Sequence, residues 1–355
     1  MDIQQIIQEI EKEIRETPYH KGTEHHIGRL RARIAKLQDE LIIRESKKSG
    51  GGGGFAIKKT GDVTVVLVGP PSVGKSTLLN KLTNAKSPVA QYEFTTVTVI
   101  PGIMSYQGAM IQILDIPGLI EGASTGRGRG RQVLSVARAA DLLLLITEVG
   151  KEKLFEDIKR ELYLAGVRVN QNPPLVRIEK KIRGGIILHL AVKQSLSGEI
   201  IKGILGEFGL SNAEITLKEK VNVERLLDAF SQNRVFIPAI FVVNKADLKK
   251  TPSREGFLYI SAKTGGGLDY LKNKIWEKLR LTRIYVAKNG QKPNYNSPII
   301  MRQGETLMDV AKKIGEQFAQ DVKGAKISGT GSNFPRQKVS LSYPIQDGMI
   351  VTFLH

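Results

Sequence analysis

The segment Gly69-Pro-Pro-Ser-Val-Gly-Lys-Ser76 decides the fold. It follows the β-branched apolar run Val63–Val68, which has the length of a strand, and it leads into a helical pattern over residues 76–82. In such a loop the backbone N–H groups curl around phosphates, and the start of the helix adds a positive dipole end. The pattern also lets Lys75 reach the β- and γ-phosphates while the Ser76 hydroxyl ligates Mg²⁺. A nucleotide-phosphate site between a strand and a helix is therefore predicted.

Four more apolar runs of strand length accompany this loop. They lie at residues 111–114, 142–146, 239–243 and 257–260. Their hydrophobicity is continuous and does not alternate, which is typical of parallel strands covered on both faces. Helical patterns lie between several of them, including those at 133–139 and 268–279. The sequence predicts an α/β fold with an open, doubly wound sheet.

Polar motifs follow three of these runs. Asp115-Ile-Pro-Gly118 offers a carboxylate for the shell of Mg²⁺ and a Gly118 amide for the γ-phosphate. Thr95 and Thr96 lie in a polar stretch between helix and strand, where a threonine can close on Mg²⁺ only in the triphosphate state. Ligands bind outside the carboxyl ends of parallel strands, so we expect these groups to converge there.

Two further motifs select the base. In Asn244-Lys-Ala-Asp247 the Asp247 carboxylate is suited to accept both N–H donors of guanine, which adenine cannot supply, while Asn244 ties the loop to the phosphate loop. Ser261-Ala-Lys263 would supply an amide to the guanine O6. These motifs favour a GTPase and disfavour an ATPase of related fold.

The remaining chain divides into further segments. Helical stripes broken at Pro18 predict an N-terminal helical hairpin over residues 1–50, followed by a glycine-rich linker at 51–61. Asn244 lies 129 positions after Asp115, whereas two βα units need about 60, so an inserted α/β module is predicted. The predicted domains are a nucleotide-binding domain at 62–166 and 236–281, an insert at 167–235 and a C-terminal domain at 282–355. In the C-terminal domain, strands at 283–286 and 350–353 are expected to flank a helix at 306–318.

Composition and charge bound the class of protein. The 355 residues include no cysteine, which excludes disulfides, thiol nucleophiles and Fe–S clusters, and the five histidines lack metal-site spacing. No apolar run approaches the roughly 18 residues of a membrane span, and the acidic amphipathic N-terminus resembles no signal peptide. We therefore expect a cytoplasmic protein without membrane insertion.

The net charge of +18 predicts a polyanionic partner such as RNA. Its distribution is uneven. Residues 61–150 carry only +1, whereas 151–235 carry +4, 236–280 carry +5, and 281–355 carry +5. The excess charge therefore lies outside the predicted phosphate site, and maintenance of solubility remains the alternative explanation.

Four stretches of the sequence also resemble a known family. Gly69-Pro-Pro-Ser-Val-Gly-Lys-Ser-Thr-Leu-Leu79, Tyr92-Glu-Phe-Thr-Thr96, Asp115-Ile-Pro-Gly-Leu-Ile-Glu-Gly-Ala123 and Gly126-Arg-Gly-Arg-Gly-Arg-Gln132 are similar to the Obg superfamily of GTPases, within it to the developmentally regulated GTP-binding (DRG) branch of archaea and eukaryotes. The resemblance implies a helix-turn-helix at the front, a ribosomal-S5-like insert and a β-grasp-like TGS domain at the end. It also implies that Thr96 is the switch I magnesium ligand, that the translation machinery is the partner, and that a eukaryotic member has a DRG-family regulatory protein.

Motifs and resemblance together predict a site for GTP and GDP. The nucleotide-binding residues are Gly69, Ser72, Val73, Gly74, Lys75, Ser76, Thr77, Asp115, Gly118, Asn244, Lys245, Asp247, Ser261, Ala262 and Lys263. Catalysis is assigned to Lys75, Thr96 and Gly118, and Mg²⁺ to Ser76, Thr96 and Asp115, the last through a water.

Leu119 stands where many small GTPases keep the glutamine that orients the attacking water. We therefore expect slow unaided hydrolysis, with the missing function supplied by a water network, a monovalent cation such as K⁺, or a partner. Related potassium-using GTPases carry asparagine where this chain has Ser72. The nearby Arg127, Arg129 and Arg131 are either a solvated loop, an RNA or partner contact, or an arginine supplied in cis.

Two functional hypotheses remain open. In the first, the chain is a ribosome-associated switch that hydrolyses GTP. In the second, it is an RNA-binding or ribosome-binding scaffold in which the guanine nucleotide is mainly a structural ligand, a hypothesis to which Leu119 gives weight. They differ in whether the affinity for the partner depends on the bound nucleotide.

Overall fold

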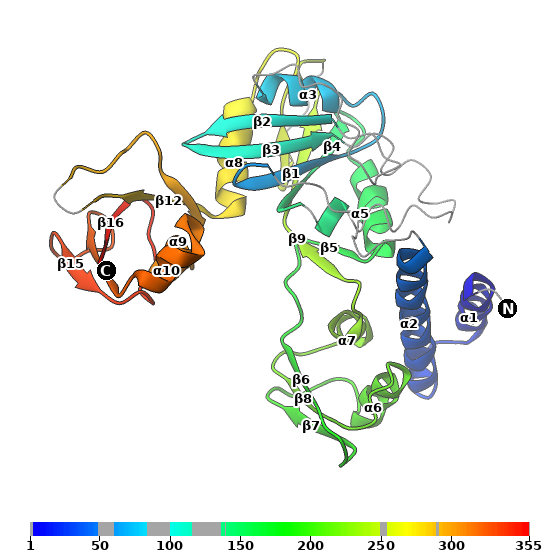
Figure 1. Ribbon diagram of the computed structural model, residues 1–355. Helices are drawn as coiled ribbons and strands as arrows, with labels where there is room; N and C mark the ends of the chain where they lie inside the picture. The colour runs from blue at the N-terminus through cyan, green and yellow to red at the C-terminus, as the bar shows by residue number, and fades with distance from the viewer. Residues whose placement is uncertain are drawn as a thin grey trace. The chain divides into compact units, whose positions relative to one another are not determined.

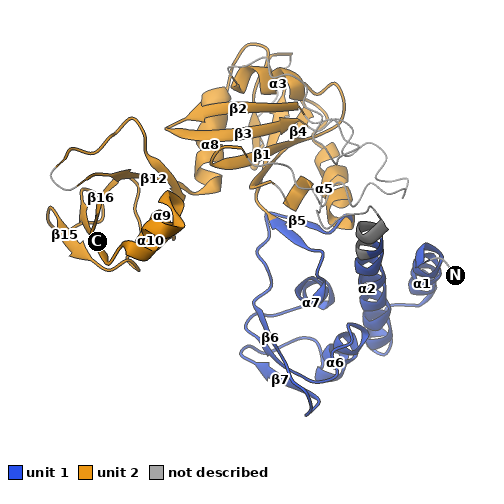
Figure 2. Cartoon of the chain, in the orientation of Figure 1, with its two compact units in different colours: residues 1–54, 165–236 blue, residues 55–164, 237–355 orange. Residues whose placement is uncertain are grey.

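The computed structural model describes residues 3–48, 60–83, 100–115, 136–138, 140–248, 254–288 and 291–354. The chain forms two compact units, coloured separately in Figure 2. One unit joins residues 1–54 with 165–236, and the other joins 55–164 with 237–355.

The second unit contains a six-stranded sheet in the order β11-β10-β4-β1-β3-β2 (Figure 1). Its elements are β1 (Val63–Val68), β2 (Ile100–Tyr106), β3 (Ala109–Asp115), β4 (Leu142–Glu148), β10 (Ala239–Asn244) and β11 (Phe257–Tyr259), with helices α3 (Lys75–Leu82), α5 (Leu154–Leu164) and α8 (Leu268–Leu279). All strand pairs are parallel except β2 with β3. The six residues of β1 are all buried, which explains the continuous apolar run. The expected doubly wound α/β sheet is confirmed.

Strand β2 was absent from the sequence-based expectation. It contains Pro101 and Gly102, both of which argue against a strand when read from sequence alone. The strand lies at the sheet edge, where a missing N–H is tolerated, and Gly102 packs closely against Thr83. Of the helix predicted at 133–139, the structure describes residues 136–138, which are helical.

The inserted segment forms a three-stranded sheet in the order β6-β8-β7. The elements of the insert are β5 (Val167–Val169), β6 (Val176–Lys180), β7 (Ile186–Leu190), α6 (Gly198–Glu207), β8 (Ala213–Leu217), α7 (Val223–Phe230) and β9 (Val235–Ile237). Ser197 and Asn222 cap the two helices by accepting hydrogen bonds from backbone N–H groups. The helices and one face of the sheet enclose an apolar core that includes Ile201, Ile204 and Ile215.

The helical hairpin belongs to the same unit as the insert. It consists of α1 (Ile3–Glu16) and α2 (Glu24–Lys48), and α2 packs against α6. Ala32 of α2 is fully buried in the core of the insert, and Arg29 pairs with Glu207 at 2.7 Å. Two segments that the sequence treats as separate thus share one core. The predicted boundaries 1–50, 51–61 and 167–235 stay predictions.

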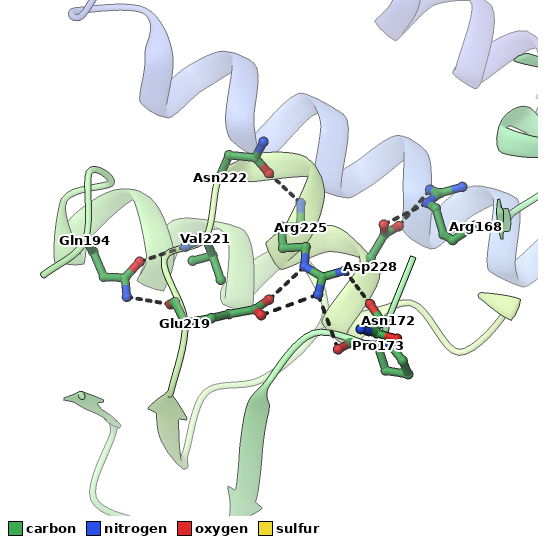
Figure 3. A network of polar contacts seen from close by, with 9 residues as sticks. All are labelled: Arg168, Asn172, Pro173, Gln194, Glu219, Val221, Asn222, Arg225 and Asp228. Atoms are coloured by element: carbon green, nitrogen blue, oxygen red, sulfur yellow. Dashed lines mark hydrogen bonds and ion pairs between the residues drawn. The ribbon is translucent and has the colours of Figure 1, made fainter. Parts of the chain in front are cut away.

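A polar network holds the two ends of the insert together (Figure 3). Arg168 of β5 donates two hydrogen bonds of 2.7 Å to Asp228 of α7, and both side chains are buried. Arg234 donates a third bond to Asp228 at 3.0 Å. Arg225 reaches Glu219 and the carbonyl oxygen of Asn172.

The C-terminal domain has a five-stranded sheet in the order β13-β12-β16-β14-β15. Its elements are β12 (Leu281–Val286), β13 (Ile299–Arg302), α9 (Leu307–Ile314), α10 (Glu316–Asp321), β14 (Gly324–Ser328), β15 (Gln337–Val339) and β16 (Met349–Leu354). The single helix expected at 306–318 is wrong, because extended backbone at Gly315 ends α9 and a second short helix follows. Thr306 and Asp309 form a capping box at the start of α9.

Candidate nucleotide-binding site

The loop at residues 69–76 joins β1 to α3 at the carboxyl edge of the six-stranded sheet. Two positions of this loop require glycine, because neighbouring atoms leave no room for a side chain. A Cβ on Gly69 would lie 2.2 Å from the carbonyl oxygen of Ile146, and one on Gly74 would lie 2.4 Å from Nδ2 of Asn244. Gly74 also has a φ of 92°, in the left-handed region. A side chain at Gly69 would displace the backbone of Ile146, and one at Gly74 would displace the buried amide of Asn244.

Polar groups of the loop lie at the start of α3. Ser72 has a φ of 62° and is exposed, whereas Val73 beside it is buried in the sheet core. Ser76 and Thr77 are exposed in the first turn of the helix. A loop anchored by Val73 thus presents hydroxyl groups and backbone amides at the end of β1, as phosphate binding requires.

Lys75 folds back over the loop. Its ammonium donates hydrogen bonds of 2.8 Å to the carbonyl oxygens of Gly69 and Pro70. The residue is 9% exposed. The positive charge is therefore held on the concave side of the loop, within reach of a phosphate bound there.

Ser76 and Asp115 meet across two parallel strands. The Ser76 hydroxyl donates a 2.8 Å hydrogen bond to Oδ2 of Asp115, which ends β3 beside Leu67 of β1. Asp115 is 1% exposed, and its Oδ1 has no hydrogen-bond partner within the described part of the chain. A buried carboxylate oxygen without a donor is costly, so this position is suited to a cation or its water shell.

Asn244 joins the phosphate loop to the two base motifs. Its Nδ2 donates to the carbonyl oxygen of Val73 at 2.8 Å, and its Oδ1 accepts from the N–H of Ala262 at 2.9 Å. The side chain is 2% exposed. Both halves of its amide are satisfied, so one buried side chain fixes three loops relative to one another.

Asp247 lies exposed in the short 3₁₀ turn Ala246–Leu248 that follows β10. A hydrogen bond from Ser261 holds the pKa of its carboxyl below the ordinary value, with a smaller contribution from the charge of Lys263. The motif at 261–263 follows β11, the neighbour of β10 in the sheet. The structure therefore brings an ionised carboxylate beside the backbone of the last predicted motif.

Several predicted residues lie outside the described part of the chain. They are Thr95, Thr96, Gly118, Leu119, Arg127, Arg129 and Arg131. Their assigned or alternative roles stay predictions. Within the described residues, no group of three or more His, Asp or Glu side chains is arranged to hold a metal ion, and no helix is long and apolar enough to cross a membrane.

Comparison with known proteins gives relatives along the whole chain. An uncharacterised GTP-binding protein of Methanocaldococcus jannaschii is 43% identical, covering 100% of this chain and 93% of the relative. Developmentally-regulated GTP-binding protein 1 of Xenopus laevis is 42% identical, with 97% of each chain covered. Developmentally-regulated GTP-binding protein 2 of Homo sapiens is 38% identical, covering 98% of this chain and 97% of the relative. This chain belongs to the family of developmentally regulated GTP-binding proteins.

Family profiles divide this DRG-type chain into consecutive matches. Residues 64–181 match the family described as 50S ribosome-binding GTPase, residues 183–281 match the C-terminal region of that domain, and residues 282–355 match the TGS domain. Among solved structures, the YchF GTPase of Schizosaccharomyces pombe is similar at 15% identity and a TM-score of 0.44, covering 84% of this chain and 99% of that one. The expected GTPase domain and C-terminal TGS domain are confirmed.

Glu148 is a candidate site residue that no sequence motif indicated. It ends β4, stands opposite Asn244 in the sheet register, and forms an ion pair with Lys245. Hydrogen bonds from Lys151 and then Lys245 hold the pKa of its carboxyl below the ordinary value. Lys245, whose φ of 63° is left-handed, is thereby fixed at the edge of the site. A polar residue at the carboxyl end of an apolar run was the available signal.

Proposed function

We propose that this chain binds GTP with Mg²⁺, hydrolyses it slowly to GDP and phosphate, and acts as a switch on the ribosome. The observation that carries the proposal is the double hydrogen bonding of Asn244, which couples the phosphate loop to the loop at 261–263. One side chain thereby joins the two loops that would hold opposite ends of a nucleotide. Membership of the DRG family supports a guanine nucleotide as the ligand.

Asp247 supports selection of guanine over adenine. An ionised carboxylate accepts hydrogen bonds but donates none, so it pairs with the two adjacent N–H donors of guanine. Adenine offers no such pair on the corresponding edge. An aspartate of ordinary pKa is ionised at neutral pH, and the hydrogen bond from Ser261 lowers the pKa of Asp247 further, so this acceptor is ionised. Backbone amides of residues 261–263 would complete the base site at the guanine O6.

Ser76 and Asp115 fit a hard divalent cation. Hydroxyl and carboxylate oxygens are ligands of Mg²⁺, and the buried Oδ1 of Asp115 lacks a donor in the described part of the chain. The Ser76 hydroxyl would ligate directly and Asp115 through a water, with Thr96 as a further ligand. Bound there, Mg²⁺ would neutralise charge on the β- and γ-phosphates.

Lys75 and the Gly118 amide would stabilise charge on the γ-phosphate. The Lys75 ammonium now donates to two neutral carbonyl oxygens, and charged phosphate oxygens are stronger acceptors. Leu119 has no polar atom with which to orient water. We therefore expect slow turnover that K⁺ or a DRG-family regulatory protein increases.

The dependence on cations has a direct test. GTP turnover by the full chain is measured in KCl and in NaCl at equal ionic strength, with and without Mg²⁺. We expect a higher rate in KCl and loss of turnover on chelation of Mg²⁺. Equal rates in the two salts would remove the K⁺ hypothesis, while the requirement for Mg²⁺ is read separately.

Two observations support the ribosome as partner. Residues 64–181 match a family described by ribosome binding, and the net charge is +18. This proposal implies action in the cytoplasm. The alternative is a scaffold in which the nucleotide is a structural ligand, favoured by Leu119.

Sedimentation with ribosomes separates the switch from the scaffold. The full chain is mixed with ribosomes in its GDP, GTP-analogue and nucleotide-free states. A switch requires that affinity for the partner differ between states, because a partner that binds both states equally shifts nothing. Equal sedimentation in all three states would establish the scaffold, and no sedimentation in any state would remove the ribosome from the proposal.

A further inference from the structure

The TGS domain carries a lysine-rich face on its sheet. Ala325 and Ile327 of β14 and Val351 of β16 point into the domain core with α9 and α10. Because side chains alternate along a strand, Lys326 and Thr352 point to the opposite face. We call this surface the lysine face and define it by Lys323, Lys326, Lys338, Thr352 and Leu354.

The strand register places two lysines directly opposite each other. Lys326 of β14 pairs with Lys338 of β15, and Thr352 of β16 pairs with Lys326 from the other side. Like charges at directly opposed positions destabilise a sheet. No ion pair involves Lys323, Lys326 or Lys338 within the described residues, and β14, β15 and β16 contain no Asp or Glu. The pairing of Lys326 with Lys338 is therefore unfavourable for folding, and the fold does not offset it with an opposite charge. Unfavourable arrangements of this kind are expected at functional sites.

The surface at these lysines is hollowed. A hollow of about 650 Å³ is lined by Lys323, Gly324, Lys326, Lys338, Val339, Ser340 and Leu354. The lining of this hollow includes three lysines and no acidic residue, so the lysine face is complementary to an anion.

An aromatic pair lies on the same face of the sheet, at β12, which is two strand positions from Lys326 and three from Lys338. Tyr285 of β12 stands opposite Ile350 of β16, and its ring packs edge-on against Tyr295 at 5.0 Å. Tyr295 is 60% exposed. Strands are spaced by about 4.8 Å, so β12 and β15 are separated by about 14 Å, within the span of a few nucleotides. Exposed aromatic rings beside cationic groups on a sheet are a binding surface for unpaired bases and their phosphates.

We propose that the lysine face and the Tyr285–Tyr295 pair bind single-stranded RNA. Lys326 and Lys338 contact phosphates, and the tyrosine rings stack with bases. The inference rests on the RNA or ribosome association in the proposed function and assigns it a surface. Duplex RNA is a poorer fit because its bases are already stacked within the helix.

The test uses the full chain and a fluorescein-labelled 12-nucleotide oligouridine. Its dissociation constant is measured by anisotropy over a series of KCl concentrations. Each phosphate contact on a single strand contributes about 0.7 to the slope of log affinity against log salt. The K326A/K338A variant is expected to lower that slope by about 1.4. The matched control K278A/K312A removes the same charge from exposed positions on α8 and α9 and is expected to leave the slope within about 0.3 of the original.

A second variant pair tests stacking. Tyr285→Ala is expected to weaken oligouridine binding by about tenfold with an unchanged salt slope, and Tyr285→Phe is expected to retain the affinity. Thermal unfolding of each variant checks that the TGS domain is folded. A slope equal to that of the unaltered chain in folded K326A/K338A overturns the proposal.

An RNA duplex and a lipid vesicle test whether the lysine face binds a ligand other than single-stranded RNA. Binding of a 12-base-pair RNA duplex as tightly as the oligouridine, or loss by K326A/K338A of binding to phosphatidylserine vesicles but not to oligouridine, also overturns it. GTP turnover and ribosome sedimentation are measured on the same variants. If K326A/K338A retains GTP turnover, ribosome sedimentation and oligouridine binding, the assignment of RNA binding to the lysine face is wrong and the proposed function stands. If the unaltered chain sediments with no ribosomes and binds no oligouridine, the RNA association itself fails.

Discussion

At the scale of single residues, the site depends on where charge is held. Asp115 is buried, and within the described residues one of its carboxylate oxygens has no hydrogen-bond donor, whereas Asp247 is exposed and accepts a hydrogen bond from Ser261 that lowers its pKa. Asp115 ends β3 and Asp247 lies in the turn after β10 of the same sheet, and the proposed function assigns them to different ends of the nucleotide. Burial suits the first to a cation, and exposure suits the second to a base that must enter from solvent.

Replacing Asp247 by alanine should weaken binding of GDP and GTP by at least about a hundredfold, because two hydrogen bonds to a charged acceptor are lost. Titration with a fluorescent guanine nucleotide measures the effect. Asp269→Ala, an exposed carboxylate of α8, is the control and should leave affinity unchanged. Unaltered affinity in Asp247→Ala would refute the base assignment.

At the scale of elements, local chemistry decides where helices begin and how segments are held. The capping box of Thr306 and Asp309 starts α9, and extended Gly315 ends it. In the insert, by contrast, the decisive contact is long-range. Arg168 and Asp228 are 60 positions apart and both are buried.

Thr306→Ala should destabilise the TGS domain by about 1 kcal/mol, since a helix cap is lost. Hydrogen bonds from the Thr306 backbone and then its hydroxyl lower the pKa of Asp309. The stability contributed by Asp309 is therefore present above its unfolded pKa of about 3.9 and is lost as pH falls through the lowered value. Urea unfolding at pH 7 and pH 3 checks both effects; a cost that is the same at both values would contradict this account.

Asp228→Ala should destabilise the unit of residues 1–54 and 165–236 by about 3–5 kcal/mol, because two guanidinium groups lose a buried carboxylate. Glu224→Ala removes a carboxylate paired with Arg31 at the surface and should cost no more than about 1 kcal/mol. Thermal or urea unfolding compares them. Equal costs would show that the network of Figure 3 does not stabilise the unit.

At the scale of the whole molecule, the positive charge is separated from the phosphate site. Residues 61–150 carry +1, whereas 281–355 carry +5. Charge at the phosphate loop is local, from Lys75, while the excess charge lies in the insert, the C-terminal part of the nucleotide-binding domain and the C-terminal domain. This distribution supports the proposal that a polyanionic partner binds outside the candidate phosphate site.

Affinity for ribosomes should fall steeply between 50 and 200 mM salt, by about 10³-fold if six phosphates are contacted. Affinity for GDP over the same range should change by less than about tenfold, because a protected phosphate site is screened less. Parallel titrations at constant Mg²⁺ measure both. A flat salt dependence for ribosomes would show that the +18 charge serves solubility.

The sequence alone determined the kind of sheet and the order of its motifs, because continuous apolar runs and Gly69-to-Ser76 are local patterns with one structural meaning. Local patterns did not predict strand β2, because Pro101 argues against a strand unless the strand lies at the edge of a sheet, and the sequence does not show that edge position. The helix expected at 306–318 failed because one glycine outweighed the apolar periodicity.

Only the tertiary structure decided the pairings between distant residues. It joined Glu148 to Lys245, placed Ala32 of the hairpin in the core of the insert, and set Lys326 opposite Lys338. Sequence periodicity states which face of an element is apolar but not which element covers it, since burial is satisfied by any apolar surface of suitable shape. The sequence therefore determined the chemical groups of each motif, and tertiary packing determined which residues position those groups.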